Sequence, residues 1–311
     1  MVITVTPNTA IDQTIRVNRL LPGTVHRAIA SKQNAGGKGI NVSSYLADWG
    51  TPTKATGFLG DNASGFESLF AQKNIEDHCI RVSGTIRTNI KIVDEHETTD
   101  INLPGFRVAQ DDLENLIDKV VCLSTKDSIT VLAGSLPPGT PDPFYREIIA
   151  PLNQKHSRTI LDADGLPLTT VLNSSDLPYC VKPNTRELSC WAGRSLESMD
   201  DILDEALRLK NAGVKLVAVS MGGNGAVFVR DDEICTVKVP VVSSMSTVGA
   251  GDAMVAGICA ALIEGGDIQR IASLSSAFSL SKLSCHGPNL PSGDLVEAAA
   301  KALKIEHRER R

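Results

Sequence analysis

The chain reads Ser246-Thr247-Val248-Gly249-Ala250-Gly251-Asp252-Ala253, and a run of small and apolar residues follows as far as Leu262. Glycine has no Cβ atom, so this turn can bring its backbone close to a ligand. The apolar run predicts a buried helix that begins at the turn. The first N–H groups of a helix have no partner within the helix and favour an anion such as a phosphate group. The stretch therefore predicts an anion cradle at the start of a buried helix.

Asp252 lies within this cradle, and its position allows two interpretations. A carboxylate in the first turn of a helix is a common partner of the helix dipole or an N-cap. A carboxylate beside a phosphate cradle also suits a general base, which takes a hydroxyl proton while the N–H groups stabilise charge on a transferred phosphoryl group. Position in the sequence does not choose between them.

A second glycine-rich turn reads Ala35-Gly36-Gly37-Lys38-Gly39-Ile40-Asn41-Val42. It has neither the Gly-x-x-x-x-Gly-Lys-Ser/Thr spacing of a P-loop nor a Gly-x-Gly-x-x-Gly. Apolar residues at i, i+3, i+4 and i+7 after it predict an amphipathic helix that ends near Gly50. Lys38 and Asn41 then lie at the helix start, where they can bind a sugar phosphate. The alternative is an exposed lysine and an amide that only caps the helix.

These two turns and five further motifs closely resemble the signatures of the ribokinase-like carbohydrate kinases, in particular the phosphofructokinase B branch. The resemblance covers nearly the whole chain, and the motifs stand in the family's order. The matching residues are Asn8, Asp12, Gly36 to Asn41, Gly134 to Gly139, Lys182 to Glu187, Ser220 to Ala226 and Gly249 to Asp252. One such motif is weak evidence, whereas this many in order is strong. The resemblance implies phosphorylation of a hexose phosphate, with ATP and Mg²⁺ as cofactors.

Length and composition indicate an ordinary globular chain. Its 311 residues, 42% hydrophobic and 22% charged, can bury a large core, and no linker divides them. We therefore expect one kinase domain over residues 1–311. The formal net charge of -5 argues against nucleic acid as a partner. The N-terminus lacks the features of a signal peptide and no apolar run is long enough for a bilayer, so we expect a cytoplasmic protein without a membrane partner.

The cysteines and the C-terminal tail carry less information. The seven cysteines are scattered and form no Cys-x-x-Cys pair. This pattern indicates reduced thiols, mostly buried, rather than a zinc site or disulfides. The basic tail from His307 to Arg311 predicts a solvated chain end.

Two regions of alternating apolar and polar residues predict a small separate sheet. Residues 11–17 alternate, and residues 85–93 and 98–103 form a β-hairpin around an acidic turn. In that hairpin Arg87, Asn89 and Lys91 share one strand face, which either offers two cations and an amide to one ligand or is simply solvated. In the family this sheet is a lid. The resemblance implies a lid built from about 11–33 and 85–104, and a homodimer formed through it.

Elsewhere, predicted strands alternate with predicted helices. Strands are expected at 2–6, 53–59, 129–133, 159–161, 179–181 and 216–219, and helices at 65–74, 143–156, 166–173, 199–212, 267–283 and 294–303. This alternation predicts an α/β fold, a doubly wound and mostly parallel central sheet flanked by helices. The polar motifs follow the strands directly, so we expect them at the carboxyl edge of the sheet, where ligands bind in such folds.

The resemblance assigns a role to each motif. Asp252 is the general base, and the N–H groups come from Gly249, Ala250 and Gly251. The implied substrate-binding residues are Asp12, Gly37, Lys38, Asn41, Arg87, Asn89, Asp100 and Ser135. The implied nucleotide-binding residues are Lys182, Asn184, Ser220, Gly222, Gly223 and Gly225. Glu187 is implied to hold Mg²⁺ through water, because Mg²⁺ dehydrates reluctantly.

Several of these residues also have purely structural interpretations. Asp12 suits a turn, and residues 221–225 suit the tight turn of a hairpin. Asn184-x-x-Glu187 suits a helix start with an acidic first turn. For these residues the pattern leaves both interpretations open.

The sequence fits two other functions less well and leaves the substrate open. A sugar-phosphate-binding regulator without activity is disfavoured, because the base, the cradle and the Asn-x-x-Glu motif are all present. A dehydrogenase is disfavoured because no strand is followed by Gly-x-Gly-x-x-Gly. Asp100 stands where the branch commonly has Glu, two residues before Asn102. Fructose 1-phosphate, giving fructose 1,6-bisphosphate, and tagatose 6-phosphate therefore both remain candidates.

Overall fold

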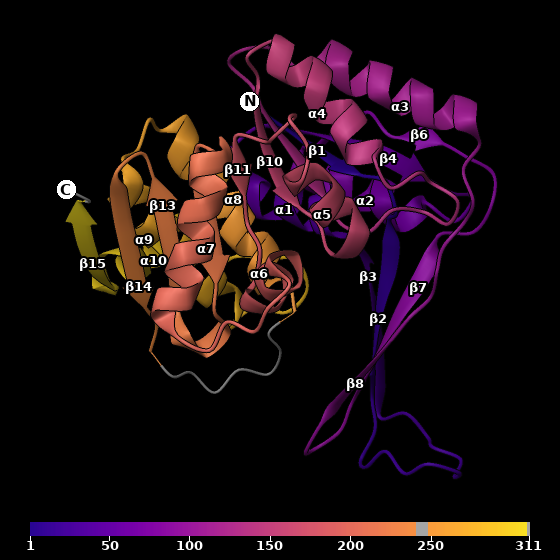
Figure 1. Ribbon diagram of the computed structural model, residues 1–311. Helices are drawn as coiled ribbons and strands as arrows, with labels where there is room; N and C mark the ends of the chain where they lie inside the picture. The colour runs from indigo at the N-terminus through magenta and orange to yellow at the C-terminus, as the bar shows by residue number, and fades with distance from the viewer. Residues whose placement is uncertain (241–247, 310–311) are drawn as a thin grey trace.

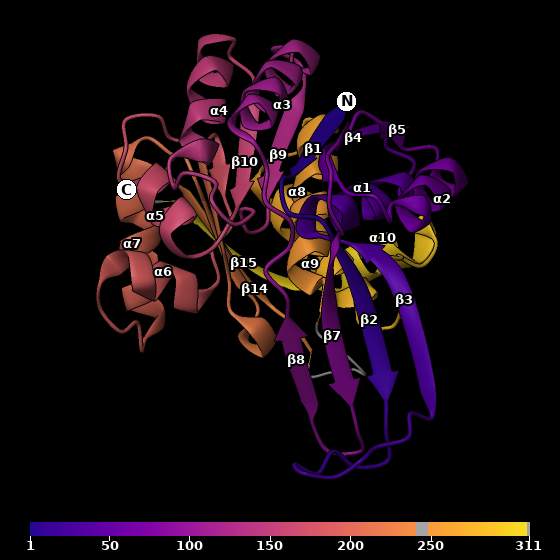
Figure 2. The ribbon, with the colours of Figure 1, turned by 90° about the vertical axis from the view of Figure 1, so that its right-hand side faces the viewer.

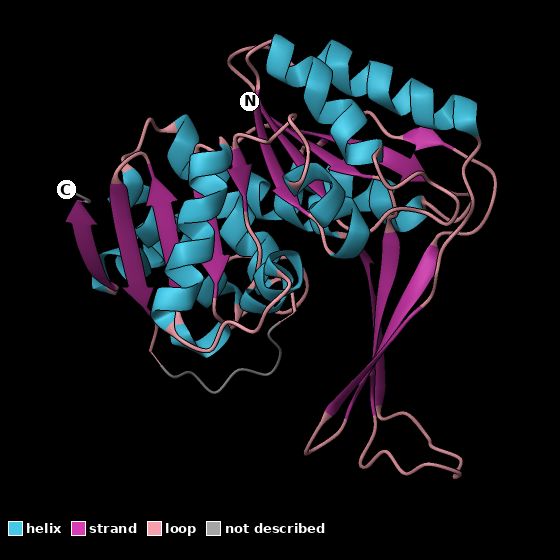
Figure 3. Cartoon of the chain, viewed as in Figure 1, coloured by secondary structure: helices cyan, strands magenta, loops and turns pink. Residues whose placement is uncertain are grey.

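A long central sheet forms the body of the molecule. The computed structural model describes residues 1–240 and 248–309, so Ser246 and Thr247 of the quoted turn lie outside the described residues. The strands of this sheet are β1 (Val2–Thr6), β4 (Thr53–Leu59), β5 (Glu76–Asp77), β6 (Ile80–Arg81), β9 (Ile129–Ala133), β10 (Arg158–Asp162), β11 (Cys180–Val181), β12 (Leu216–Ser220), β13 (Ala226–Arg230), β14 (Glu233–Lys238) and β15 (Lys304–Glu309). Figure 3 distinguishes these strands from the surrounding helices.

The strand order confirms the predicted fold class. It runs β15-β14-β13-β12-β11-β10-β9-β1-β4-β5, and β6 pairs with β4. The pairs from β5 across to β12 are parallel, whereas β12, β13, β14 and β15 pair antiparallel. Because strands on both sides of β1 are parallel to it, their carboxyl ends meet at one edge of the sheet.

Helices bury both faces of this sheet. One core contains side chains from α2 (Ser64–Lys73), α3 (Gln110–Leu123), α4 (Phe144–Gln154), α5 (Gly165–Leu172), α6 (Thr185–Ala192) and α7 (Met199–Ala212). The other contains side chains from α1 (Lys38–Asp48), α8 (Ala250–Ile263), α9 (Ile268–Lys282) and α10 (Gly293–Ala302). Strand β12 alternates between them: Val217 and Val219 enter the first core, and Leu216 and Ala218 the second.

A second, four-stranded sheet projects from the body (Figures 1 and 2). Its order is β3-β2-β7-β8, from Ala30–Gly36, Ala10–Arg16, Arg87–Val93 and Thr98–Asn102. The predicted hairpin is the antiparallel pair β7 and β8. Asp94 holds its turn, because the carboxylate accepts hydrogen bonds from the backbone N–H groups of Leu20, His96 and Glu97. These bonds lower the pKa of Asp94 to about 2.

One local prediction was wrong, and one predicted helix is more deeply buried than expected. The C-terminal tail is not a free solvated end: residues 304–309 form β15, which pairs with β14. Only Ile305 of this strand is partly buried against the core, so the hydrophobic pattern gave no signal. Helix α1 is present as predicted, but both of its faces are covered, since its residues from Gly39 to Leu46 are all buried. It lies between the sheet and α8, with Ile40 in one core and Val42 in the other.

The remaining expectations concern the cysteines and the membrane. All seven cysteines are free thiols, and four of them, Cys79, Cys180, Cys235 and Cys259, are buried. This agrees with the predicted reduced and mostly buried thiols. Among the described residues, no helix combines the length and the apolar character needed to cross a bilayer.

Candidate active site

The carboxyl edge of the sheet brings polar residues from four strands together. Asn8 follows β1, Ser135 follows β9, Asp162 ends β10 and Lys182 follows β11. The Asn8 side-chain N–H donates to Ser135 Oγ at 3.3 Å, and the Gly134 N–H donates to the Asp162 backbone oxygen at 3.0 Å. The motifs predicted for this edge therefore lie there, and hydrogen bonds link them from strand to strand.

Asp162 is the centre of a buried ion cluster that the sequence motifs did not include. One oxygen of its carboxylate lies 3.2 Å from Lys38 Nζ and 3.3 Å from Lys182 Nζ, and its side chain is 2% exposed. Burial alone would raise the pKa of Asp162, but the charges of Lys182 and Lys38 hold it below its usual range. In turn, Asp162 raises the pKa of Lys38 despite the opposing effect of burial. Lys38 therefore stays charged beside the Asp162 carboxylate.

Asp252 lies in the first turn of α8 and is buried. The Asn41 side-chain amide donates to its Oδ2 atom at 2.8 Å. Burial and the nearby Asp162 charge raise the pKa of Asp252 to about 6, although Lys38 and Asn41 oppose the shift. A carboxyl group with a pKa near neutrality is a better general base than an ordinary aspartate, because it binds a proton more firmly.

The glycines of the α8 turn leave room for neighbouring side chains. Gly249 is the N-cap of α8 and has a φ of 80°, a value that side-chain-bearing residues rarely adopt. A Cβ atom on Gly249 would lie 2.5 Å from the Tyr45 hydroxyl oxygen, and one on Gly251 would lie 3.5 Å from Lys182 Nζ. Lys182 thus approaches the turn from β11. The N–H groups of Gly249, Ala250 and Gly251 begin the helix, as the sequence predicts for an anion cradle.

At the start of α1, both structural alternatives are wrong. Lys38 is not a merely exposed lysine, because it pairs with Asp162. Asn41 does not cap the helix: Gly37 occupies the N-cap position, and the Asn41 side chain binds Asp252 instead. Gly37 has a φ of 111°, and a Cβ atom there would lie 2.8 Å from Thr6 Cγ2. The glycine therefore allows the helix start to approach β1.

Asp12 and Asn89 face each other across the base of the projecting sheet. They are register partners in β2 and β7, and the Asn89 amide donates to Asp12 Oδ1 at 3.0 Å. Burial raises the pKa of Asp12, while Asn89 acts in the opposite direction. Asp12 is therefore a strand residue rather than a turn residue, and its carboxylate can accept hydrogen bonds from a ligand.

Arg87 and Lys91 lie on the same strand but have different surroundings. The Arg87 guanidinium donates to the backbone oxygens of Asn8 and Leu103, both at 3.3 Å. Within the described residues it forms no ion pair with a carboxylate. Lys91 lies four residues further along β7, about 13 Å away, and pairs with Asp100 at 2.6 Å. Arg87 therefore keeps a charge for an anion at the base of the sheet, whereas Asp100 neutralises Lys91 and both lie farther out.

The predicted nucleotide residues are assembled by a helix cap and a hairpin turn. Asn184 is the N-cap of α6, and it forms an isolated parallel bridge with Ser220 at the end of β12. The predicted hairpin turn is present: Gly222–Asn224 forms a short 3₁₀ helix between β12 and β13. At Gly225, φ is 94° and a Cβ atom would overlap the Val237 carbonyl oxygen. The hairpin turn therefore requires glycine at position 225, and the turn interpretation of this motif is correct whether or not it also contacts a nucleotide.

Glu187 belongs to a reciprocal cap at the same helix start. Its Oε2 atom accepts the Asn184 N–H at 2.9 Å, while Asn184 Oδ1 accepts the Glu187 N–H at 2.8 Å. Burial raises the pKa of Glu187, and Lys182 opposes this. No cluster of three or more metal-ligating side chains occurs in the described part of the chain. The helix-start interpretation of this motif is therefore present in the structure.

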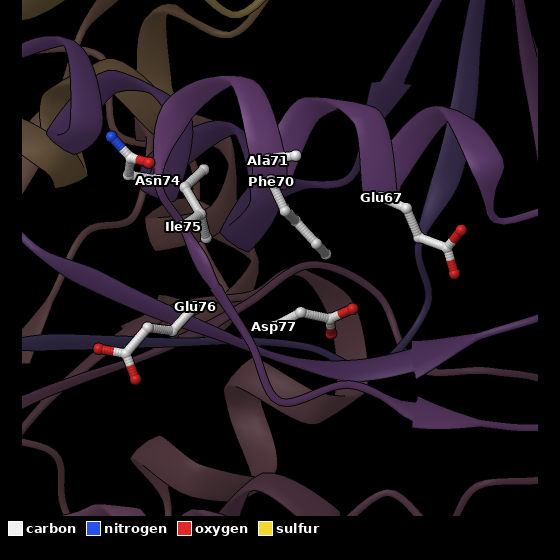
Figure 4. A pocket seen from close by; sticks show the side chains of 7 residues that line it. All are labelled: Glu67, Phe70, Ala71, Asn74, Ile75, Glu76 and Asp77. Atoms are coloured by element: carbon white, nitrogen blue, oxygen red, sulfur yellow. The ribbon is translucent and has the colours of Figure 1, made fainter.

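One surface hollow lies away from this edge of the sheet. Figure 4 shows it beside α2 and β5, lined by Glu67, Phe70, Ala71, Asn74, Ile75, Glu76 and Asp77. Its lining contains three carboxylates and no cation, so it offers no charged partner for an anionic ligand. A sugar phosphate or a nucleotide is better matched to the lysines at the carboxyl edge of the sheet.

Comparison with solved structures first defines the class. Phosphofructokinase-2 from Escherichia coli, in complex with potassium, has the same fold with a TM-score of 0.89 and 29% sequence identity, covering 96% of this chain and 98% of that chain. The fold is thus that of the ribokinase-like kinases. The pfkB family carbohydrate kinase model matches residues 3–294. The chain belongs to this family of carbohydrate kinases, and a kinase uses ATP as its phosphoryl donor.

Curated relatives extend the comparison over nearly the whole chain. The 1-phosphofructokinase of Xanthomonas campestris pv. campestris is 43% identical over 309 residues, covering 97% of each protein. The 1-phosphofructokinase of Escherichia coli K12 is 33% identical over 308 residues, covering 98% of this chain and 97% of that protein. The family resemblance inferred from the sequence motifs is confirmed.

Proposed function

We propose that this chain transfers the γ-phosphoryl group of ATP to fructose 1-phosphate and produces fructose 1,6-bisphosphate. The curated relatives named 1-phosphofructokinase support this substrate. The observation that carries the chemistry is the buried Asp252 carboxylate, whose pKa is raised to about 6 at the start of α8. This group can take the proton of the acceptor hydroxyl as the new bond to phosphorus forms.

The remaining residues of the cradle supply charge and position. The N–H groups of Gly249, Ala250 and Gly251 stabilise the charge on the transferred group, since they point from a fixed helix start. Lys182 lies next to this turn and meets the ATP phosphates. We assign the nucleotide site to Lys182, Asn184 and Ser220 together with the glycines of the β12 to β13 turn.

The sugar phosphate contacts the base of the projecting sheet. Asp12 and Asn89 bind sugar hydroxyls, because they form one hydrogen-bonded pair beside the body. Arg87 binds the phosphate that the sugar already carries, since it has backbone partners but no carboxylate partner among the described residues. We further propose that this sheet, about 11–33 and 85–104, is the lid of a single kinase domain and excludes water when it closes.

A homodimer through this sheet is part of the proposal. The residues of β8 are exposed along its whole length, and Ile101 and Leu103 are 46% and 42% exposed. Apolar side chains on an outer strand favour contact with another protein surface. Because ATP and sugar phosphates are cytoplasmic metabolites, we propose the cytoplasm as the location of this reaction.

Glu187 fits an indirect contact with Mg²⁺. Its Oε2 atom is occupied by the helix cap, and Oε1 has no hydrogen bond within the described residues. A single carboxylate suits an ion that keeps most of its waters and binds substrate phosphates. When bound, Mg²⁺ neutralises part of the charge on the ATP phosphates. The protein's part is to hold Glu187 in place through its cap with Asn184.

An assay of substrate preference tests the proposed function. The purified protein is given ATP and Mg²⁺ with fructose 1-phosphate, fructose 6-phosphate, tagatose 6-phosphate, fructose or tagatose. We expect the highest kcat/KM with fructose 1-phosphate. A clear preference for tagatose 6-phosphate would instead favour the alternative left open by Asp100. ATP-dependent turnover of none of these sugars, with tight binding of one, would indicate a regulator without catalytic activity.

A further inference from the structure

Lys282 is a buried cation behind the anion cradle, and the proposed mechanism does not use it. It is the last residue of α9 and is 5% exposed. Its Nζ atom donates to the Cys285 backbone oxygen at 2.9 Å. Lysine is seldom buried to this extent unless its charge has a partner or a task.

The packing of two helices brings Lys282 to the cradle. Helices α8 and α9 are joined by a short turn and pack so closely that a Cβ atom on Gly257 would overlap Ser275 Cα. The two helices run in opposite directions, and seven residues make about two helical turns. The start of α8, seven residues before Gly257, therefore lies beside the end of α9, seven residues after Ser275. Accordingly, Lys282 Cε lies 3.5 Å from the position of a Cβ atom on Gly249.

The Tyr45 hydroxyl provides a second, independent observation at the same turn. Tyr45 is fully buried, and its oxygen has no hydrogen-bond partner among the described residues. That oxygen lies 2.5 Å from the Cβ position of Gly249. A buried hydroxyl without a partner costs free energy, so this oxygen beside the turn is a polar group that the folded protein leaves unsatisfied.

We propose that Lys282 is a positioning residue, a built-in cation that holds the Gly249 to Gly251 turn from behind and strengthens its attraction for the transferred phosphoryl group. The inference rests on the proposed function. In a buried site a positive charge is weakly screened, so it acts on the turn in front of it. Burial lowers the pKa of Lys282, and the Asp252 carboxylate in the same turn opposes this shift because it attracts the ammonium charge. Because the ammonium group already supplies a monovalent cation, turnover does not require added K⁺ or NH₄⁺.

The first test compares wild type with Lys282→Met in buffers without K⁺ or NH₄⁺. Removal of one direct hydrogen-bond donor from such a cradle costs about 10²- to 10³-fold in kcat, so an indirect contribution is expected near tenfold. KM for fructose 1-phosphate should change little, because Lys282 does not contact the proposed sugar site. Lys301→Met is the matched control, since Lys301 is exposed on α10.

The second test adds KCl or NH₄Cl, with choline chloride as the ionic-strength control. Small monovalent cations should restore part of the kcat of Lys282→Met and leave the wild type unchanged. A wild type activated several-fold by K⁺ or NH₄⁺ would overturn the proposal, even if the variant did not fold. The proposal would also be overturned if Lys282→Met had the same kcat as Lys301→Met. The same holds if Lys282→Met lost kcat and thermal stability together and neither K⁺ nor NH₄⁺ restored its kcat. A wild type inactive on every sugar phosphate would instead overturn the proposed function and this inference with it.

Discussion

Two ion pairs show how differently the body and the projecting sheet use charge. On the sheet, Lys91 and Asp100 approach to 2.6 Å, with side chains 15% and 51% exposed. In the body, Lys182 and Asp162 are 3.3 Å apart, with side chains 5% and 2% exposed. The shorter pair is the weaker one, because solvent screens exposed charges and an exposed pair contributes only about 0–1 kcal/mol. Breaking a buried pair by removing one partner costs about 3–5 kcal/mol.

This difference separates two tasks. In the body, buried charges shift the properties of a neighbouring acid, since Asp162 contributes to the raised pKa of Asp252. On the sheet, residues of intermediate exposure present hydrogen-bonding groups that a ligand can reach. We therefore propose that the chemistry takes place at the carboxyl edge of the central sheet and that the projecting sheet recognises the sugar phosphate. Four substitutions test this division.

Asp252→Asn should have the largest effect. The amide keeps the shape of the side chain but cannot take a proton, so kcat should fall by about 10²- to 10⁴-fold while substrate binding remains nearly intact. Single-turnover kinetics measures this loss. In the wild type, kcat should rise with pH through about 6, because the base acts only when it is deprotonated.

Stability provides the control for this substitution. The folded-state pKa of Asp252 is raised, so the folded protein binds a proton more firmly than the unfolded chain. Its contribution to stability is therefore lost as the pH rises from about 3.8 to about 6, and the loss is complete at higher pH. Asp252→Asn should therefore melt no earlier than wild type at pH 8. A variant that retained the wild-type rate within a few-fold would remove Asp252 from the mechanism.

Arg87→Ala should lower kcat/KM for fructose 1-phosphate by about ten- to a hundredfold, because a charged hydrogen-bond partner of the phosphate is lost. The residual rate with free fructose should barely change. Lys91→Ala is the matched control: it removes a cation from the same strand that Asp100 already neutralises, so its effect should be smaller. Equal losses on fructose and fructose 1-phosphate would show that Arg87 supports the sheet rather than the phosphate.

Glu187→Gln should raise the Mg²⁺ concentration needed for half-maximal rate by several-fold, with partial recovery at high Mg²⁺. The chain contains a matched control. Asp201 forms the same kind of reciprocal cap with Ser198 at the start of α7. Asp201→Asn makes the same carboxylate-to-amide change in a cap of the same type and should leave the Mg²⁺ dependence unchanged. If both variants only melted earlier, Glu187 would be a helix cap and nothing more.

Asp162→Asn should have the smallest effect of the four substitutions. The quantity to measure is the position of the acidic limb, the pH at which kcat falls on the acidic side of its pH profile. Removing the anion beside Asp252 takes away one cause of its raised pKa, so the limb should move to lower pH. Asp232→Asn, at the exposed pair with Lys210, should not move the limb. A limb that stayed in place or moved to higher pH would contradict the electrostatic link between the body carboxylates.

The sequence by itself determined much of this protein. Strand alternation, glycine turns and apolar helices placed most elements of the central sheet, the projecting hairpin and the helix that begins at Gly249, because these patterns depend on local geometry. The order of the motifs also pointed to the carbohydrate kinase family, which the comparisons confirm. The sequence did not predict strand β15, because this strand is stabilised by backbone pairing with β14 rather than by a hydrophobic pattern.

Tertiary structure alone decided the electrostatics of the site. Asp162 is only the last residue of a strand in the sequence, yet it joins Lys38 and Lys182 because three segments of the chain meet at one edge of the sheet. Likewise, the Asn41 amide reaches Asp252 across 211 positions of sequence. Local patterns report how a residue sits in its own strand or helix. A pKa depends on burial and on charges from other segments, and these exist only after the chain has folded.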